Sequence, residues 1–127
     1  MFIKSVLFSI IFVLFIHTNA FADSLFFKPF STSDYILYGL DITANTADML
    51  TTLDIKNVPY THETNIIMGP HPTDAKVIGY FAAVDVLEGL IGYALPPVAR
   101  KALFTIDIGV ESYMAYHNYN MGLKFAF

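Results

Sequence analysis

Three long hydrophobic segments, each with carboxylates near its middle, constrain the fold of this chain more than any other feature. They cover residues 34–53, 73–95 and 98–120, and each has the length and composition of a helix. The acids in their interiors are Asp41, Asp48, Asp85, Glu88, Asp107 and Glu111. No lysine or arginine lies mid-segment to pair with them. A stable fold must therefore turn these acids toward one another, toward water or toward a bound cation.

The polar residues of the first and third segments recur at helical spacing. On the first segment they follow positions i, i+4, i+7 and i+11, at Asp41, Asn45, Asp48 and Thr52. On the third they follow i, i+4 and i+11, at Asp107, Glu111 and Asn118. Such spacing places each set on one face of a helix. The pattern predicts an all-α, three-helix bundle with a polar interior.

Capping and breaking residues mark the ends of the expected helices. Ser31 or Ser33 is expected to cap the first helix, and Thr73 begins the second. The Pro96–Pro97 pair ends the second helix, and Gly122 ends the third. The three helices are therefore joined by one long loop and one short turn.

The N-terminus has the features of a secretory signal peptide. Lys4 precedes an apolar run over residues 6–16, and an Ala20-x-Ala22 exit follows. We expect cleavage after Ala22, which makes residues 1–22 the signal peptide and residues 23–127 a single helical domain. The alternative is an uncleaved anchor helix, although the run is short against the roughly 20 residues that span a bilayer.

Composition excludes several classes of protein. The chain has no cysteine, which rules out disulfides, thiolate metal sites and cysteine nucleophiles. Its net charge is −4, and removal of Lys4 with the signal peptide makes it more negative. Nucleic acid is therefore not an expected partner, because nucleic acids attract basic surfaces.

The second segment favours embedding in a membrane. Its interior, residues 77–95, would be about 28 Å long as a helix, close to the roughly 30 Å hydrocarbon core of a bilayer. Arg100 and Lys101 stand near the start of the third helix, from which they are expected to reach a membrane interface. The predicted location is the membrane, the inner membrane in a bacterium, with the periplasm as second choice. Membrane lipid is the expected partner, and a homo-oligomer or a protein partner stays open.

The loop over residues 61–74 carries further polar side chains and is stiffened by one glycine and two prolines. If it folds onto the helices, carboxylates and imidazoles together could bind a divalent metal. The candidate ligands are Asp41, Asp48, Glu63, His71 and Glu111. The supporting polar residues are Asn45, Asn65, Asp85, Glu88, Asp107, His117 and Asn118. Their spacing matches no compact metal motif, so no catalytic residue is assigned.

Three functions are compatible with these residues. The favoured one is a small membrane-embedded binding or structural protein with an acidic, cation-binding interior. The second is a metal-dependent membrane hydrolase, and the third is a soluble exported interaction domain. A network of neutral, hydrogen-bonded carboxyl groups is the structural alternative to any site.

The loop and the C-terminus carry a resemblance to a known family. Residues 63–73 read Glu-Thr-Asn-Ile-Ile-Met-Gly-Pro-His-Pro-Thr, and residues 120–125 read Asn-Met-Gly-Leu-Lys-Phe. With Asp41, Thr46 and Glu111, they resemble small bacterial and prophage membrane proteins of uncharacterised activity, whose loop reads Glu-x-Asn-Pro-x-x-Gly-x-His-Pro-Ser. This chain departs from that loop at Ile66 and Thr73. The resemblance implies that Glu63, Asn65, Gly69, His71 and Pro72 are matched positions, and it implies no activity.

Overall fold

The computed structural model describes residues 26–126 as an all-helical fold, which confirms the expected fold class. Its elements are α2 (Thr32–Thr52), the short 3-10 helix η1 (Leu53–Asn57), α3 (Asp74–Ala94) and α4 (Pro97–Asn120). Residues 26–126 contain no strand. The signal peptide expected over residues 1–22 lies outside the described residues.

Local hydrogen bonds explain where the helices begin. Ser31 caps α2 by accepting from the Asp34 backbone N–H at 3.3 Å, and the Asp34 carboxylate accepts from the Ser31 backbone N–H at 2.8 Å. This reciprocal pair is a capping box. Thr73 caps α3 with its side chain, which accepts from the Lys76 backbone N–H. Pro97 opens α4, where a missing N–H costs nothing. The caps expected at Ser31 and Thr73 are therefore confirmed.

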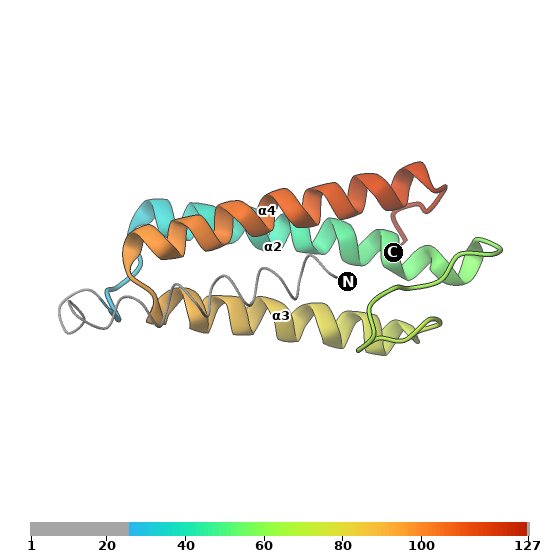
Figure 1. Cartoon of the computed structure of the whole chain (residues 1–127), viewed down its shortest axis with the longest axis horizontal. Coiled ribbons are helices and arrows are strands. Elements are labelled where there is room, and N and C mark those ends of the chain that lie inside the picture. Colours follow the sequence, from blue (N-terminus) through green and yellow to red (C-terminus); the bar gives the residue numbers. More distant parts are fainter. Residues whose placement is uncertain (1–25, 127) are drawn as a thin grey trace.

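The three long helices lie with their axes roughly parallel, and chain direction alternates from one to the next (Figure 1). α2 and α4 consequently run in the same direction and lie side by side. α3, which comes between them in the chain, runs in the opposite direction. α2 packs far more extensively on α4 than on α3, and α3 has its fewest contacts with α4. This arrangement makes the α2–α4 pair the centre of the bundle.

The buried face of this pair is mostly polar. On α2 the buried residues are Asp34, Asp41, Ala44, Asn45, Asp48, Thr51 and Thr52. On α4 they are Arg100, Leu103, Phe104, Asp107, Glu111, Ala115 and Asn118. The single polar faces expected from the sequence therefore point inward, as predicted.

Two small clusters of buried apolar residues lie toward the ends of the bundle. Met68 of the loop packs with Val77 and Phe81 of α3 at one end. Leu95, Leu103 and Phe104 form the other cluster. Gly92 permits that second contact, because a Cβ on it would lie 2.5 Å from the Phe104 ring. The bundle thus has an apolar contact near each end and a polar middle.

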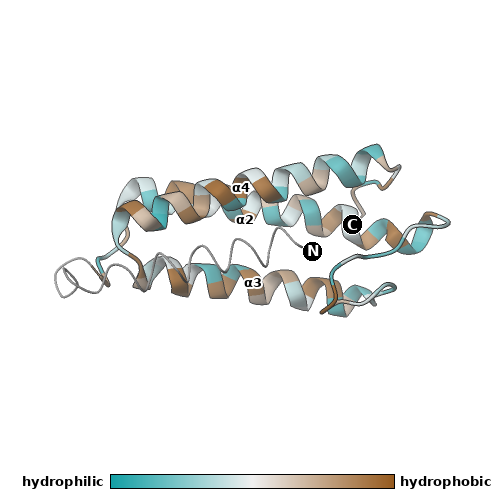
Figure 2. Cartoon of the chain, in the orientation of Figure 1, coloured by the Kyte–Doolittle hydropathy of each residue, from teal (hydrophilic) through white to brown (hydrophobic). Residues whose placement is uncertain are grey.

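Large hydrophobic side chains cover much of the outside. They occur on all three helices, at Tyr35, Ile36, Leu40, Ile78, Val86, Leu87, Leu90, Tyr93, Val98, Ile106, Tyr113, Tyr116 and Tyr119. Figure 2 shows hydrophobic segments on the visible sides of α3 and α4. Among the described residues, α3 is the one helix that is long and apolar enough to cross a membrane, and only 17% of its most apolar window is buried.

The loop before α3 is ordered by its own backbone. Glu63 donates its N–H to the Pro70 carbonyl at 3.0 Å, and Gly69 donates to the Asn65 carbonyl at 2.9 Å. Gly69 has a φ of 77°, a left-handed conformation that glycine adopts without strain. These contacts define a turn around the left-handed Gly69, and the stiffness expected from the glycine and prolines stays a prediction.

Candidate cation site

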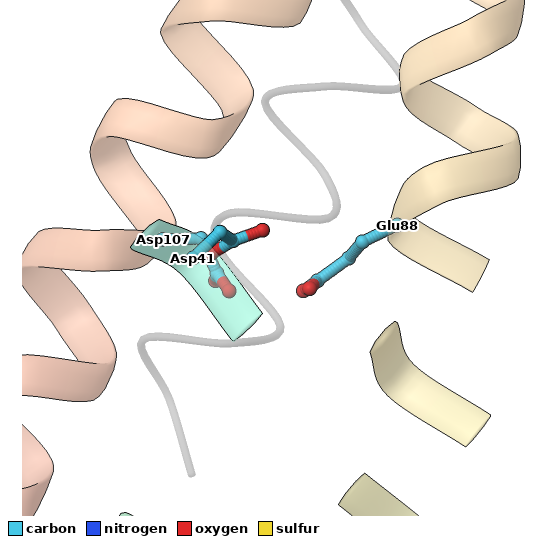
Figure 3. Close-up of side chains that lie close together, drawn as sticks. All are labelled: Asp41, Glu88 and Asp107. Atoms are coloured by element: carbon cyan, nitrogen blue, oxygen red, sulfur yellow. The ribbon is translucent and has the colours of Figure 1, made fainter. Parts of the chain in front are cut away.

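Three carboxylates from the three long helices converge in the middle of the bundle. Asp41 of α2, Glu88 of α3 and Asp107 of α4 each offer an oxygen within 4.8 Å of the other two. Figure 3 shows these side chains pointing toward one another from separate helices. Each of the three residues lies in the middle part of its own helix, so the group sits away from both ends of the bundle.

The group is shielded from water. Asp41 is 0% exposed and Asp107 is 8% exposed, whereas Glu88 is partly buried. Both carboxylate oxygens of Asp41 lack a hydrogen-bond donor among the described residues, as do Glu88 Oε2 and Asp107 Oδ2. Buried carboxylate oxygens normally accept hydrogen bonds. These oxygens therefore need a proton held between two carboxyl groups, or a bound cation.

More acidic groups surround the three. Repulsion from Asp85 and Glu111 also reaches the Asp41 carboxylate. The Oδ1 of Asp85 accepts a hydrogen bond from the Asn45 amide at 2.6 Å. The ion pairs of the described residues join Lys56 to Asp74 and Arg100 to Asp34, and neither involves the central group. Within residues 26–126, no basic side chain forms an ion pair with the acids in the middle of the bundle.

Asp48 belongs to a separate hydrogen-bond network. Its Oδ1 accepts from the Asn118 amide at 2.8 Å, and the same amide donates to the Thr51 hydroxyl at 3.0 Å. Asn118 thereby ties α4 to the C-terminal part of α2. This network accounts for Asp48 and Asn118, two of the polar residues that the sequence placed on the same helix faces as Asp41 and Asp107.

The loop residues lie outside the group of three carboxylates. Glu63 is partly buried, and its Oε1 accepts from the Asn65 backbone N–H at 2.6 Å. His71 is exposed and lines a small pocket beside Lys56 and Asp74, whereas His117 is exposed near the end of α4. Among the described residues, the atoms within mutual ligand distance come from Asp41, Glu88 and Asp107. Asp41 is thus the one predicted ligand in this group, since Asp48, Glu63, His71 and Glu111 do not belong to it.

Glu88 and Asp107 were assigned only supporting roles from the sequence. The one sequence feature that could have grouped them with Asp41 is their position, because Asp41, Glu88 and Asp107 all lie well inside their helices. Helical spacing relates residues along one helix, but it does not give the register between helices. The structure supplies that register and brings the three carboxylates to one level.

Arg100 is a structural residue that the sequence analysis placed incorrectly. It is 0% exposed, and it does not extend to an interface. Its guanidinium donates to the Asp34 carboxylate at 3.1 Å and to backbone carbonyls of Lys28 and Gly92, each at 2.6 Å. It also stacks 4.4 Å from the centre of the Phe30 ring. Carbonyls at the C-terminal end of α3 attract the positively charged Arg100 side chain. This attraction offsets the unfavourable position of Arg100 near the start of α4.

Comparisons with known proteins assign no family to the chain. No family model, no curated protein and no solved structure matches it. The resemblance of the loop to small prophage membrane proteins stays a prediction.

Proposed function

We propose that this protein is a membrane-embedded helical bundle that binds a cation at Asp41, Glu88 and Asp107. One observation carries the proposal: three carboxylates from three helices converge, and both oxygens of the fully buried Asp41 have no hydrogen-bond donor among the described residues. A buried carboxylate without a donor is costly unless a proton or a cation satisfies it. The carboxylates of Asp107 and Glu88 converge on this unsatisfied side chain.

The distribution of side chains supports the membrane part of the proposal. Polar residues fill the α2–α4 contact, and large apolar residues cover the outside. A helix of a water-soluble bundle has the opposite pattern, with its apolar stripe toward the core. α3 has 21 residues and is about 31 Å long, enough for a hydrocarbon core of roughly 30 Å. Acids that face the bundle interior avoid contact with lipid.

The ligand atoms favour a hard cation. All three are carboxylate oxygens, which suit calcium, magnesium or manganese, and no imidazole belongs to the group. Calcium binds carboxylate oxygens at about 2.3–2.6 Å in flexible geometry, whereas magnesium demands near-ideal octahedral geometry at about 2.0–2.1 Å. Calcium therefore makes the smaller geometric demand on three ligands that come from three separate helices.

Calcium binding to purified protein tests the cation site. The full-length chain is expressed, purified in a nonionic detergent and stripped with a chelator before calorimetric titration. We expect one calcium site in the unmodified protein and none in Asp41→Asn. Asp54→Asn is the matched control, because Asp54 lies in η1 and its carboxylate is bonded to Asn57 and to the Lys124 backbone N–H. Circular dichroism verifies that each variant is helical.

Two results would overturn the cation site. One is an unmodified protein that binds neither calcium nor manganese, which would leave a shared proton as the neutralising charge. The other is Asp41→Asn binding calcium as tightly as the unmodified protein. Should Asp41→Asn fail to fold, Glu88→Gln replaces it in the titration. Glu88 is less buried than Asp41, and its replacement by glutamine still removes one carboxylate ligand.

A carbonate wash tests the membrane part separately. Membranes from cells that express the chain are washed at alkaline pH, which releases peripheral proteins. We expect the protein to stay in the membrane pellet and to be extracted only by detergent. Recovery in the wash would show a soluble or peripheral protein, whatever the result of the calcium titration.

A further inference from the structure

A pocket of about 710 Å³ lies at the loop end of the bundle, apart from the three convergent carboxylates. Loop residues 60–68 form one wall, and Tyr80 and Phe81 of α3 form another. The remaining lining comes from the end of α2, from η1, from the C-terminal half of α4 and from Met121 and Leu123 beyond it. Asp41, Glu88 and Asp107 do not line it. Its size is within the roughly 300–1,000 Å³ typical of small-molecule sites.

The walls of this pocket are largely apolar. Phe81 is 3% exposed, and Val110 and Met114 are partly buried beside it. The large exposed residues of the lining include Tyr60, Ile66 and Ile67, whose side chains are aromatic or aliphatic. Apolar side chains therefore line both the opening of the pocket and its interior. Such a lining favours a ligand with a hydrocarbon chain.

The charged side chains of the pocket are acidic. Glu63 and Asp48 line it, whereas none of the described lining residues is a lysine or an arginine. Asp48 is already held by Asn118. The Glu63 carboxylate is fixed by the Asn65 backbone N–H, which leaves its second oxygen for a ligand. A fixed carboxylate beside an apolar cavity favours a positively charged head group and disfavours an anionic one.

We propose that this pocket binds a long-chain amine, with the hydrocarbon chain against Phe81, Val110 and Met114 and the ammonium group at Glu63. The shared chemistry is an ammonium group on a hydrocarbon chain, which a free amine or an ethanolamine-headed phospholipid can supply. The proposal goes beyond the cation site and does not require that site to be occupied.

Tryptophan quenching in vesicles tests the location of the chain. The protein has no tryptophan, so one introduced indole is the sole reporter. Tyr113→Trp places it in the pocket lining, at a residue that is 58% exposed. Tyr35→Trp is the matched control, 65% exposed on α2 and outside the lining. In phosphocholine vesicles, brominated dodecylamine is expected to quench the Tyr113→Trp variant saturably and the Tyr35→Trp variant only in proportion to its membrane concentration.

Replacement of Glu63 tests whether its negative charge binds the ammonium group. In the Tyr113→Trp background, Glu63→Gln is expected to weaken binding of the amine about tenfold, equivalent to about 1.4 kcal/mol. Binding of brominated dodecanol should not change, because the alcohol carries no charge. Asp74→Asn is the control for general surface charge, since Asp74 is exposed and does not line this pocket. Val110→Phe should weaken the amine and the alcohol alike by narrowing the cavity.

The source of the amine follows from a second probe. If an ethanolamine phospholipid with brominated chains saturates the signal at a lower membrane fraction than dodecylamine, the ligand is a lipid. The reverse order identifies a free amine. Equal, unsaturable quenching of both tryptophan variants would overturn the proposal, as would an anionic brominated chain that binds as tightly as the amine. Neither result bears on calcium binding at Asp41.

Discussion

Replacement of Arg100 should destabilise the bundle more than any other change of a single basic residue. Its side chain is 0% exposed and joins the segment before α2, the start of α2 and the end of α3 to α4. Arg100→Ala would leave the Asp34 carboxylate buried without its partner and several carbonyls without a donor. Removing one member of a buried ion pair typically costs about 3–5 kcal/mol. We expect a loss near 4 kcal/mol within that range.

Denaturant titration in detergent, followed by circular dichroism, measures this loss. Arg100→Lys should be intermediate, because a lysine keeps the charge but cannot reproduce the planar set of guanidinium donors. Lys101→Ala is the matched control, since Lys101 is exposed and its loss should change stability by no more than about 0.5 kcal/mol. An Arg100→Ala variant as stable as Lys101→Ala would refute the role assigned to this residue.

Two further predictions concern packing and pH. Gly92→Ala should destabilise the protein by about 1–3 kcal/mol, because the new Cβ would meet the Phe104 ring at 2.5 Å. Gly79→Ala, with open space around the new Cβ, should instead stabilise it by roughly 0.5–1 kcal/mol in the same denaturant assay. The Asn57 amide lowers the pKa of Asp54, so this carboxyl stabilises the fold above its ordinary pKa and loses that contribution as pH falls through its lower folded value. Asp54→Asn should remove this part of the acid sensitivity, and unchanged acid unfolding would contradict it.

The helices could be predicted because their signals are local. The expected starts at Ser31 and Thr73 rest on hydrogen bonds that span three residues, and the structure confirms both. The inward faces of α2 and α4 also follow from spacing along one helix. Each of these features is fixed by residues that are neighbours in the sequence.

The candidate site could be predicted only in part, because it depends on the register between helices. Asp41 was identified, but its partners Glu88 and Asp107 come from helices whose relative heights no local pattern specifies. The loop residues Glu63 and His71 satisfied the chemistry of a metal ligand and yet lie outside the group. Arg100 was placed incorrectly for a similar reason, since the carbonyls that bury it come from segments distant in sequence.

An infrared difference spectrum on calcium addition tests the central claim most directly. In chelator-treated protein, the convergent carboxyl groups should share protons, because they cannot all be ionised together without a cation. Calcium should displace those protons and convert the protonated carboxyl band into an ionised carboxylate band. The change should weaken as pH falls, because metal ligands must be deprotonated, and it should vanish in Asp41→Asn. A carboxyl spectrum that calcium leaves unchanged in the unmodified protein would contradict the account.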